Sequence, residues 1–195
     1  MVYHSQWNGF ETEVLCGCGV YDVKLSKEAI GAGAGNGPAK NMPAVEPNEE
    51  TGENEEKTDI LDEVLYYFKA NMLFRAFNLK GPGDCTMLYM MLYVQQVLKR
   101  IVGLKKDKAK NAAIALGIES FETPADRGFI FGDFFAKPSS PKEAERWAEY
   151  IKQLRLELGL RVVEKTFKFP EADGTGNKFW LSYSKGTLLN KCFEK

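Results

Sequence analysis

Hydrophobic residues recur at helical spacing over three long stretches of the chain. From Ile60 to Met72 the apolar positions follow the period of an α-helix, which predicts a helix over residues 58–77 with Thr58-Asp59 as its N-cap. A second helix is expected to start at residue 84 or 86 and to run to about residue 102. Its first half, Met87 to Val94, is apolar on every face. A helix of this kind is surrounded by neighbours, so we expect it at the centre of the domain.

The pattern continues with a short helix over residues 106–116, closed by Gly117. Ser140-Pro-Lys-Glu143 forms a capping box with proline at the first helical position, and the helix that follows is expected to end at Gly159. Residues 163–169 and 178–184 then alternate between apolar and polar, which predicts a small C-terminal β-hairpin. The predicted fold is therefore mainly α, a compact helical domain with a central buried helix.

A loop rich in phenylalanine lies between the last two helices, and we expect its rings to pin it onto the core. These phenylalanines are Phe121, Phe129, Phe131, Phe134 and Phe135. Two tryptophans, Trp147 and Trp180, are either core residues or anchors of an interface.

Residues 31–57 differ from the rest of the chain because they contain almost no large apolar side chains. A glycine-rich stretch from Gly31 to Gly37 is followed by an acidic stretch. Such a segment buries too little surface to offset the entropy of ordering. We therefore divide the chain into an N-terminal arm over 1–30 that packs on the core, a flexible linker over 31–57, and one helical domain over 58–195.

Charge is balanced over the whole chain but not along it. The 195 residues carry a formal net charge of −1, yet residues 1–80 hold 7 Lys/Arg against 13 Asp/Glu, and residues 81–195 hold 19 against 14. The basic residues gather after the central helix. They are Lys99, Arg100, Lys105, Lys106, Lys108 and Lys110.

This basic cluster has two interpretations: a solvated face, or a contact with an acidic partner surface. No aromatic side chain interleaves it, and near-zero net charge is untypical of proteins that grip phosphates, so we expect no nucleic-acid partner.

Candidate catalytic chemistry is sparse. The only histidine is His4, which we interpret as a surface or docking residue near the terminus, so a histidine-based triad or metal site lacks its parts. Cys16 and Cys18 form half a zinc site at most, and Cys85 and Cys192 could complete four thiolates only on paper. No glycine of the 31–37 stretch satisfies G-x-G-x-x-G. We predict no enzyme activity, no cofactor and no metal.

The longest all-apolar run, Met87 to Val94, has eight residues, whereas a membrane helix needs about 20. No basic-then-apolar stretch opens the sequence. The sequence therefore predicts no membrane insertion and a cytoplasmic protein.

An ordered set of short segments resembles the 21 kDa subunit of the actin-related protein 2/3 complex, also called subunit 3. The likeness is carried first by Asp59-Ile-Leu-Asp-Glu-Val-Leu-Tyr-Tyr-Phe-Lys-Ala-Asn71 and Thr86-Met-Leu-Tyr-Met-Met-Leu-Tyr93. It continues in shorter matches: Tyr3-His-Ser5, Leu116-Gly-Ile118, Ala136-Lys-Pro138, Gln153-Leu-Arg155, Gly159-Leu-Arg161, Phe179-Trp180 and Asn190-Lys191. No single motif marks a chemistry, but together they span nearly the whole chain in order.

The resemblance implies a non-catalytic subunit of a seven-subunit assembly that nucleates branched actin filaments. In that family the subunit rests against actin-related protein 3, and contact with the actin filament is a further expectation. The nucleotide sites of such an assembly belong to its actin-related proteins. Here an acidic stretch of about 18 residues separates Gly37-Pro-Ala39 from the helix at Asp59, where the family has a short link.

Two other functions remain open from the residues alone. One is a basic-patch protein-interaction module that acts independently of actin. The other is an enzyme that uses Cys16 or Cys18 as a nucleophile, which requires a thiol of depressed pKa.

Overall fold

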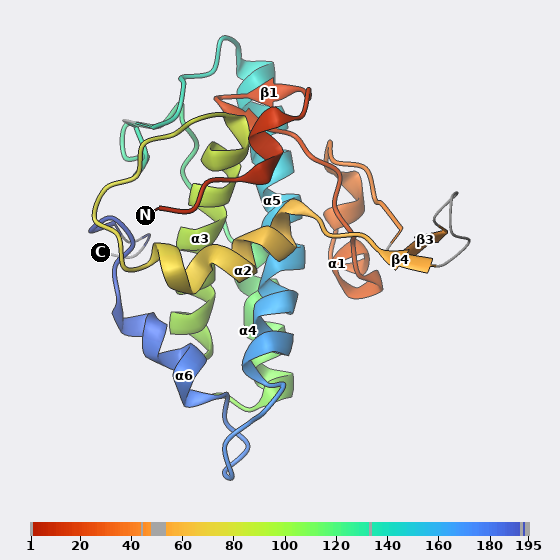
Figure 1. Cartoon of the computed structure of the whole chain (residues 1–195), viewed down its shortest axis with the longest axis vertical. Coiled ribbons are helices and arrows are strands. Elements are labelled where there is room, and N and C mark those ends of the chain that lie inside the picture. Colours follow the sequence, from red (N-terminus) through yellow and green to blue (C-terminus); the bar gives the residue numbers. More distant parts are fainter. Residues whose placement is uncertain (1, 44, 48–53, 133, 192, 194–195) are drawn as a thin grey trace.

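The computed structural model describes residues 2–43, 45–47, 54–132, 134–191 and 193. Its framework is four helices: α2 (Ile60–Asn71), α3 (Pro82–Ile101), α4 (Lys106–Ile118) and α5 (Pro141–Thr166). The long helices α3 and α5 run side by side, α2 crosses them, and α4 packs against α5 (Figure 1). This confirms the mainly α fold.

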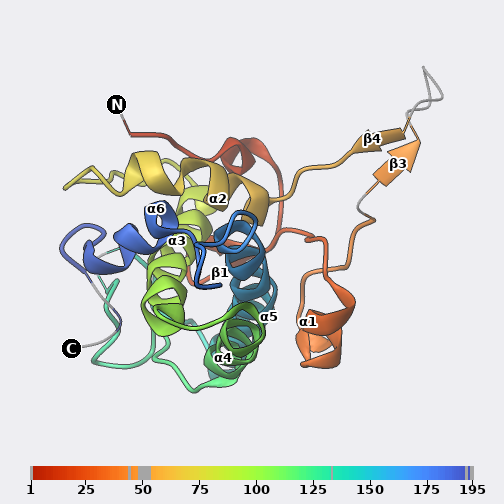
Figure 2. The same cartoon turned by 90° about the horizontal axis from the view of Figure 1, so that it is seen from below.

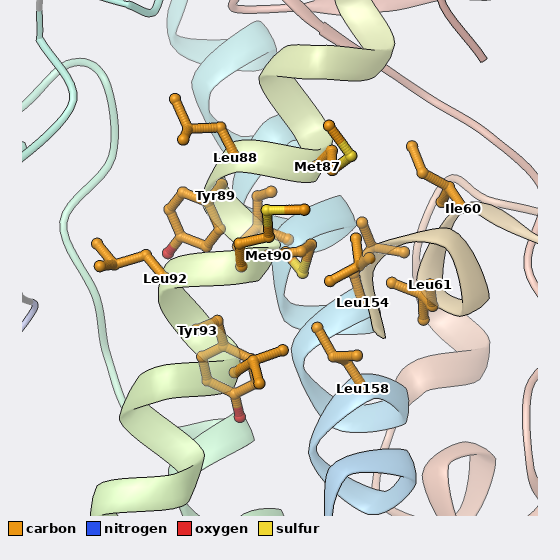
Figure 3. Packing of buried hydrophobic residues seen from close by; sticks show 14 of the residues in the cluster. Ile60, Leu61, Met87, Leu88, Tyr89, Met90, Leu92, Tyr93, Leu154 and Leu158 are labelled. Carbon is orange, nitrogen blue, oxygen red and sulfur yellow. The ribbon is translucent and has the colours of Figure 1, made fainter. Parts of the chain in front are cut away.

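The central helix is α3, as its sequence predicts. Every residue from Met87 to Val94 is at most 1% exposed. Figure 3 shows Met90 of α3 facing Leu154 and Leu158 of α5, with Ile60 and Leu61 of α2 lying beyond them on the same side of α3. Other helices and chain segments surround α3, so apolar side chains on every face of this helix are shielded from water.

Two of these helices begin at the N-cap residues that the sequence predicts. Asp59 and Asp62 form a reciprocal capping box at the start of α2. The Ser140 hydroxyl accepts from the Glu143 amide, with Pro141 at the first position of α5. Helix α2 ends at Asn71, six residues before the predicted end.

The predicted end of α5 at Gly159 is wrong. The helix continues to Thr166, because Leu160, Val162 and Val163 stay on its buried side. A Cβ at Gly159 would lie 3.5 Å from the Ala113 Cβ, an ordinary van der Waals distance, so glycine is not required where α4 and α5 meet here.

The predicted C-terminal position of the small β-hairpin is also wrong. Residues 163–166 belong to α5, and residues 178–185 form α6 (Lys178–Leu181) and the 3₁₀ helix η3 (Ser182–Lys185). The short antiparallel pairs of the described chain lie elsewhere. They are β1 (Val14–Leu15) with β2 (Cys18–Gly19), and β3 (Val45–Pro47) with β4 (Asn54–Glu56).

The N-terminal arm covers one side of the helical bundle. It contains the 3₁₀ helix η1 (Gln6–Gly9) and the β1–β2 hairpin, which contacts α3 and α5. Between its two strands, Cys16 and Gly17 adopt positive φ angles of 49° and 87°, the backbone that a tight hairpin turn requires. After the hairpin come α1 (Lys27–Gly31) and the 3₁₀ helix η2 (Ala34–Asn36).

Part of the expected linker is packed rather than free. Ala34 is fully buried, and Ala39 exchanges two backbone hydrogen bonds with the Gln153 side chain of α5, at 3.0 and 2.8 Å. Strands β3 and β4 stand away from the helical body and from α1 (Figure 2). Residues 44 and 48–53 of the expected linker lie outside the described residues.

The phenylalanine-rich loop after α4 is pinned to the core as predicted. Phe129, Phe131 and Phe135 are at most 7% exposed, and their rings contact Tyr89 of α3. Trp147 of α5 is fully buried among these rings, so it is a core residue.

Candidate interaction surfaces

The predicted basic cluster is divided among several carboxylates. Arg100 at the end of α3 binds Glu119 through two hydrogen bonds of 2.6 and 3.0 Å. On α4, Lys106 pairs with Glu164 at 3.1 Å and Lys110 pairs with Glu28 at 2.6 Å. Half of the cluster is therefore offset within the chain.

Lys105 and Lys108 are the exposed remainder of that cluster on α4. Lys105 is the N-cap residue and its backbone bridges to Thr175, so its position is set by the fold. Lys99, the remaining member, is half-buried on α3. Lys105 and Lys108 are thus exposed at the beginning of α4.

An exposed aromatic surface, which the sequence does not reveal, lies on the outer side of α2. We define the α2 aromatic surface as Tyr3, Tyr66, Tyr67 and Trp180. Tyr66 is 79% exposed, and Tyr3 stacks on Tyr67 with their ring centroids 5.0 Å apart. Together with Trp7, three of these residues line a hollow of about 790 Å³.

A lysine side chain lies at one edge of this surface. The Lys69 ammonium sits 4.2 Å from the centre of the Trp180 ring, a cation–π arrangement. Aromatic side chains are enriched in protein interfaces relative to the remaining surface. The α2 aromatic surface therefore has the composition of a protein-binding face, and helical periodicity alone cannot show it because only the fold brings Tyr3 and Trp180 to α2.

The first residues of the chain are held by two carboxylates and an amide. Asp84, fully buried at the start of α3, accepts from the Ser5 amide and contacts the His4 ring nitrogen, both at 2.7 Å. Glu63 accepts from the Ser5 hydroxyl at 2.5 Å and from the Gln6 amide at 2.7 Å. Burial raises the pKa of Glu63.

Asn71 completes this attachment by exchanging hydrogen bonds with both backbone groups of Tyr3, at 3.0 and 2.9 Å. His4 is thus an anchor of the arm on the core, a role that its isolation in the sequence does not indicate. The same attachment holds Tyr3 in place, so it also shapes the α2 aromatic surface.

A charged network at the other end of α2 joins three parts of the chain. Arg161 of α5 binds Asp59, Asp62 and Glu157, and also donates to the Lys24 carbonyl. Burial would raise the pKa of Asp59, but the Arg161 guanidinium outweighs burial and holds that pKa below its ordinary value.

The three described cysteines are buried free thiols. Burial raises the pKa of Cys16 to about 12, and the pKa of Cys85 is raised as well, first by a hydrogen bond with Cys18 and then by burial. Cys16 and Cys85 therefore stay protonated at neutral pH, which argues against Cys16 as a nucleophile. Cys192 lies outside the described residues.

The described residues hold neither a cluster of metal ligands nor a membrane-spanning helix. Among them, no group of three or more His, Cys, Asp or Glu side chains could hold a metal ion. No described helix is long and apolar enough to span a membrane.

Known proteins match the chain over nearly its whole length. The family model described as "P21-Arc: ARP2/3 complex ARPC3 (21 kDa) subunit" matches residues 1–193. Actin-related protein 2/3 complex subunit 3 of Arabidopsis thaliana is 34% identical over 192 residues, covering 97% of this chain and 98% of the relative. The subunit 3 of Dictyostelium discoideum is 31% identical, covering 98% and 99%. That of Schizosaccharomyces pombe is 36% identical over 138 residues, covering 71% and 78%.

Proposed function

Since the chain belongs to the P21-Arc family of ARP2/3 complex 21 kDa subunits, we propose that it is a non-catalytic structural subunit of that complex. In this role it contacts actin-related protein 3, supports nucleation of branched actin filaments, and works in the cytoplasm at the actin cytoskeleton. The observation that carries the proposal is the family match over residues 1–193.

The two surfaces fit two kinds of contact. Permanent interfaces between subunits are more apolar than transient ones, so the α2 aromatic surface suits the contact with actin-related protein 3. Charged surfaces act mainly on association rate and specificity. The basic cluster, Lys99 to Lys110, therefore suits a contact with an acidic filament surface, and its exposed members Lys105 and Lys108 are the residues to test.

The direct test is native mass spectrometry of the tagged protein isolated from its own cells. The expected result is a single stoichiometric assembly that contains both actin-related proteins. Recovery of other proteins without either actin-related protein would favour the actin-independent interaction module and overturn the proposal.

A further inference from the structure

A cavity of about 460 Å³ lies between the middle of α5 and the loop that follows α4. Its walls include the rings of Phe121, Phe129 and Phe193. Arg155 of α5 and the carboxylates Glu119 and Glu122 supply its charged groups. This volume and this mixture of apolar walls with a few polar groups are typical of small-ligand pockets.

Arg155 is the unusual group in this cavity because it is a buried cation without a carboxylate. Arg155 is only 2% exposed. Its guanidinium carbon lies 4.8 Å from the centre of the Tyr93 ring and 4.4 Å from the centre of the Phe121 ring. One terminal nitrogen donates to the Leu116 carbonyl at 2.8 Å. Within the described part of the chain, Nε has no acceptor and no carboxylate forms an ion pair with this arginine.

An arrangement of this kind is costly unless something completes it. A buried charge is normally paired, and a buried donor without an acceptor destabilises the folded protein. The two aromatic rings compensate part of the charge through their π faces. Among the described residues, the buried Nε donor still lacks an acceptor.

The acidic residues of the cavity limit what that acceptor can be. Glu119, a wall residue, is engaged by both terminal nitrogens of Arg100, and Arg155 contributes only a weaker electrostatic attraction to it. Glu122 is exposed, with its carboxylate beside Gly128, another wall residue. One buried arginine against two carboxylates in the walls favours a ligand with a single carboxylate and disfavours a polyanion.

We propose that this cavity binds a monocarboxylate on a flat apolar body, with the carboxylate on Arg155 and the body between the phenylalanine rings. The carboxylate can belong to a free organic acid or to a side chain of a neighbouring subunit. The proposal does not depend on the role in the actin-related complex, because it rests only on the cavity and its buried guanidinium.

The test uses benzoate as the probe, titrated into the full-length protein and followed by calorimetry and by NMR of the Phe121–Phe129 loop. Benzamide is the matched neutral control, equal in shape but without charge. The expected result is saturable benzoate binding at least about tenfold tighter than that of benzamide, since charge-assisted hydrogen bonds are the stronger ones. Equal affinity for the two probes, or no saturable binding of benzoate, overturns the proposal.

Three variants locate the bound carboxylate. Arg155→Met keeps the packing of the stem and should abolish the preference for benzoate, whereas Arg155→Lys keeps the charge but loses the planar fork and should weaken binding about tenfold. Glu122→Gln leaves the buried core untouched and should tighten benzoate binding about threefold by removing a like charge. If both arginine variants fail to fold, Glu122→Gln still decides: unchanged or weaker binding contradicts the proposal.

Two further measurements identify the source of the carboxylate. Benzoate that binds the isolated chain but not the assembled complex assigns the natural carboxylate to a partner side chain. Benzoate that binds both assigns it to a free acid.

Discussion

The guanidinium of Arg161 grips the carboxylate of Asp59 through both oxygens, with two contacts of 2.7 Å. The two residues are 102 positions apart, and Asp59 is fully buried while the Arg161 side chain is 14% exposed. The pair fastens the first turn of α2 to α5 and orients the capping box.

Replacing Asp59 with Asn should destabilise the protein by about 3 kcal/mol, because it leaves a buried guanidinium short of its counter-charge. Chemical denaturation at pH 7 measures the loss. Asp62→Asn is the matched control: its side chain is 33% exposed, so it should cost no more than about 1 kcal/mol. Equal losses for the two variants would refute the special role of the buried pair.

The pH dependence of stability follows from the same pair. The folded pKa of Asp59 is held below its ordinary value, so its contribution is present in full above the unfolded value of about 3.9 and is lost as the pH falls through the folded pKa. Denaturation curves between pH 6 and acid should therefore show a smaller acid-induced loss in Asp59→Asn than in the parent chain.

Attachment of the N-terminal arm should depend on Asp84. The Asp84→Ala variant leaves the Ser5 and Lys80 amides without their acceptor, and we expect a loss of about 3 kcal/mol and rapid proteolysis of residues 2–9. Limited proteolysis followed by mass spectrometry detects the cut. Asp84→Asn keeps one acceptor oxygen and should cleave more slowly; an arm equally resistant in all three proteins would contradict this.

Two glycines at the contact of α4 and α5 should respond oppositely to alanine. At Gly117 a Cβ would lie 2.8 Å from a Leu156 methyl carbon, so Gly117→Ala should destabilise by about 1–3 kcal/mol. At Gly159 the nearest atoms are 3.5 Å away, so Gly159→Ala should be neutral or stabilising by up to about 1 kcal/mol. Thermal unfolding compares the two.

Charge reversal tests the exposed part of the basic cluster. The double variant Lys105→Glu/Lys108→Glu should lower filament branch density severalfold at low salt and less at high salt, because exposed charges are screened. Fluorescence microscopy of branching reactions with the reconstituted complex gives the density. Lys142→Glu/Lys152→Glu makes the same charge change on exposed positions of α5 and should have no effect.

The α2 aromatic surface should matter for assembly and not for folding. Tyr66→Ser removes a side chain that is 79% exposed, so stability should change by less than about 0.5 kcal/mol while assembly weakens about tenfold. Leu73→Ser is the control, equally exposed but outside that surface. Co-purification with the other subunits distinguishes the two, and equal effects would rule out a specific aromatic contact.

The sequence predicts the helix starts and the central buried helix well, because the residues that mark them act through local contacts or through their own hydrophobicity. Asp59 and Ser140 announce helix starts because their side chains bond to backbone amides nearby. The apolar run Met87 to Val94 indicates a buried helix because every face of it is hydrophobic.

Prediction from sequence failed where long-range contacts override local preference. Gly159 looks like a helix end but lies inside α5, and Val163 and Phe167 suit a strand yet are held in and beside that helix by the core. The i,i+4 ion pair between Glu157 and Arg161, at 2.8 Å, forms only if that helix continues past Gly159. The interaction surfaces were equally hidden, since Tyr3 and Trp180 meet α2 only in the folded chain.

The contacts of the N-terminal arm with α5 affect how the protein folds during synthesis. Cys16 donates its amide to Glu143, 127 residues later, and Ser26 donates to Glu157, 131 residues later. At about 5–20 residues per second, a ribosome needs on the order of ten seconds to supply these partners. The part of the arm from Cys16 to Ser26 therefore cannot complete its contacts until α5 has left the exit tunnel, whereas residues 3–6 can attach to α2 and α3 earlier.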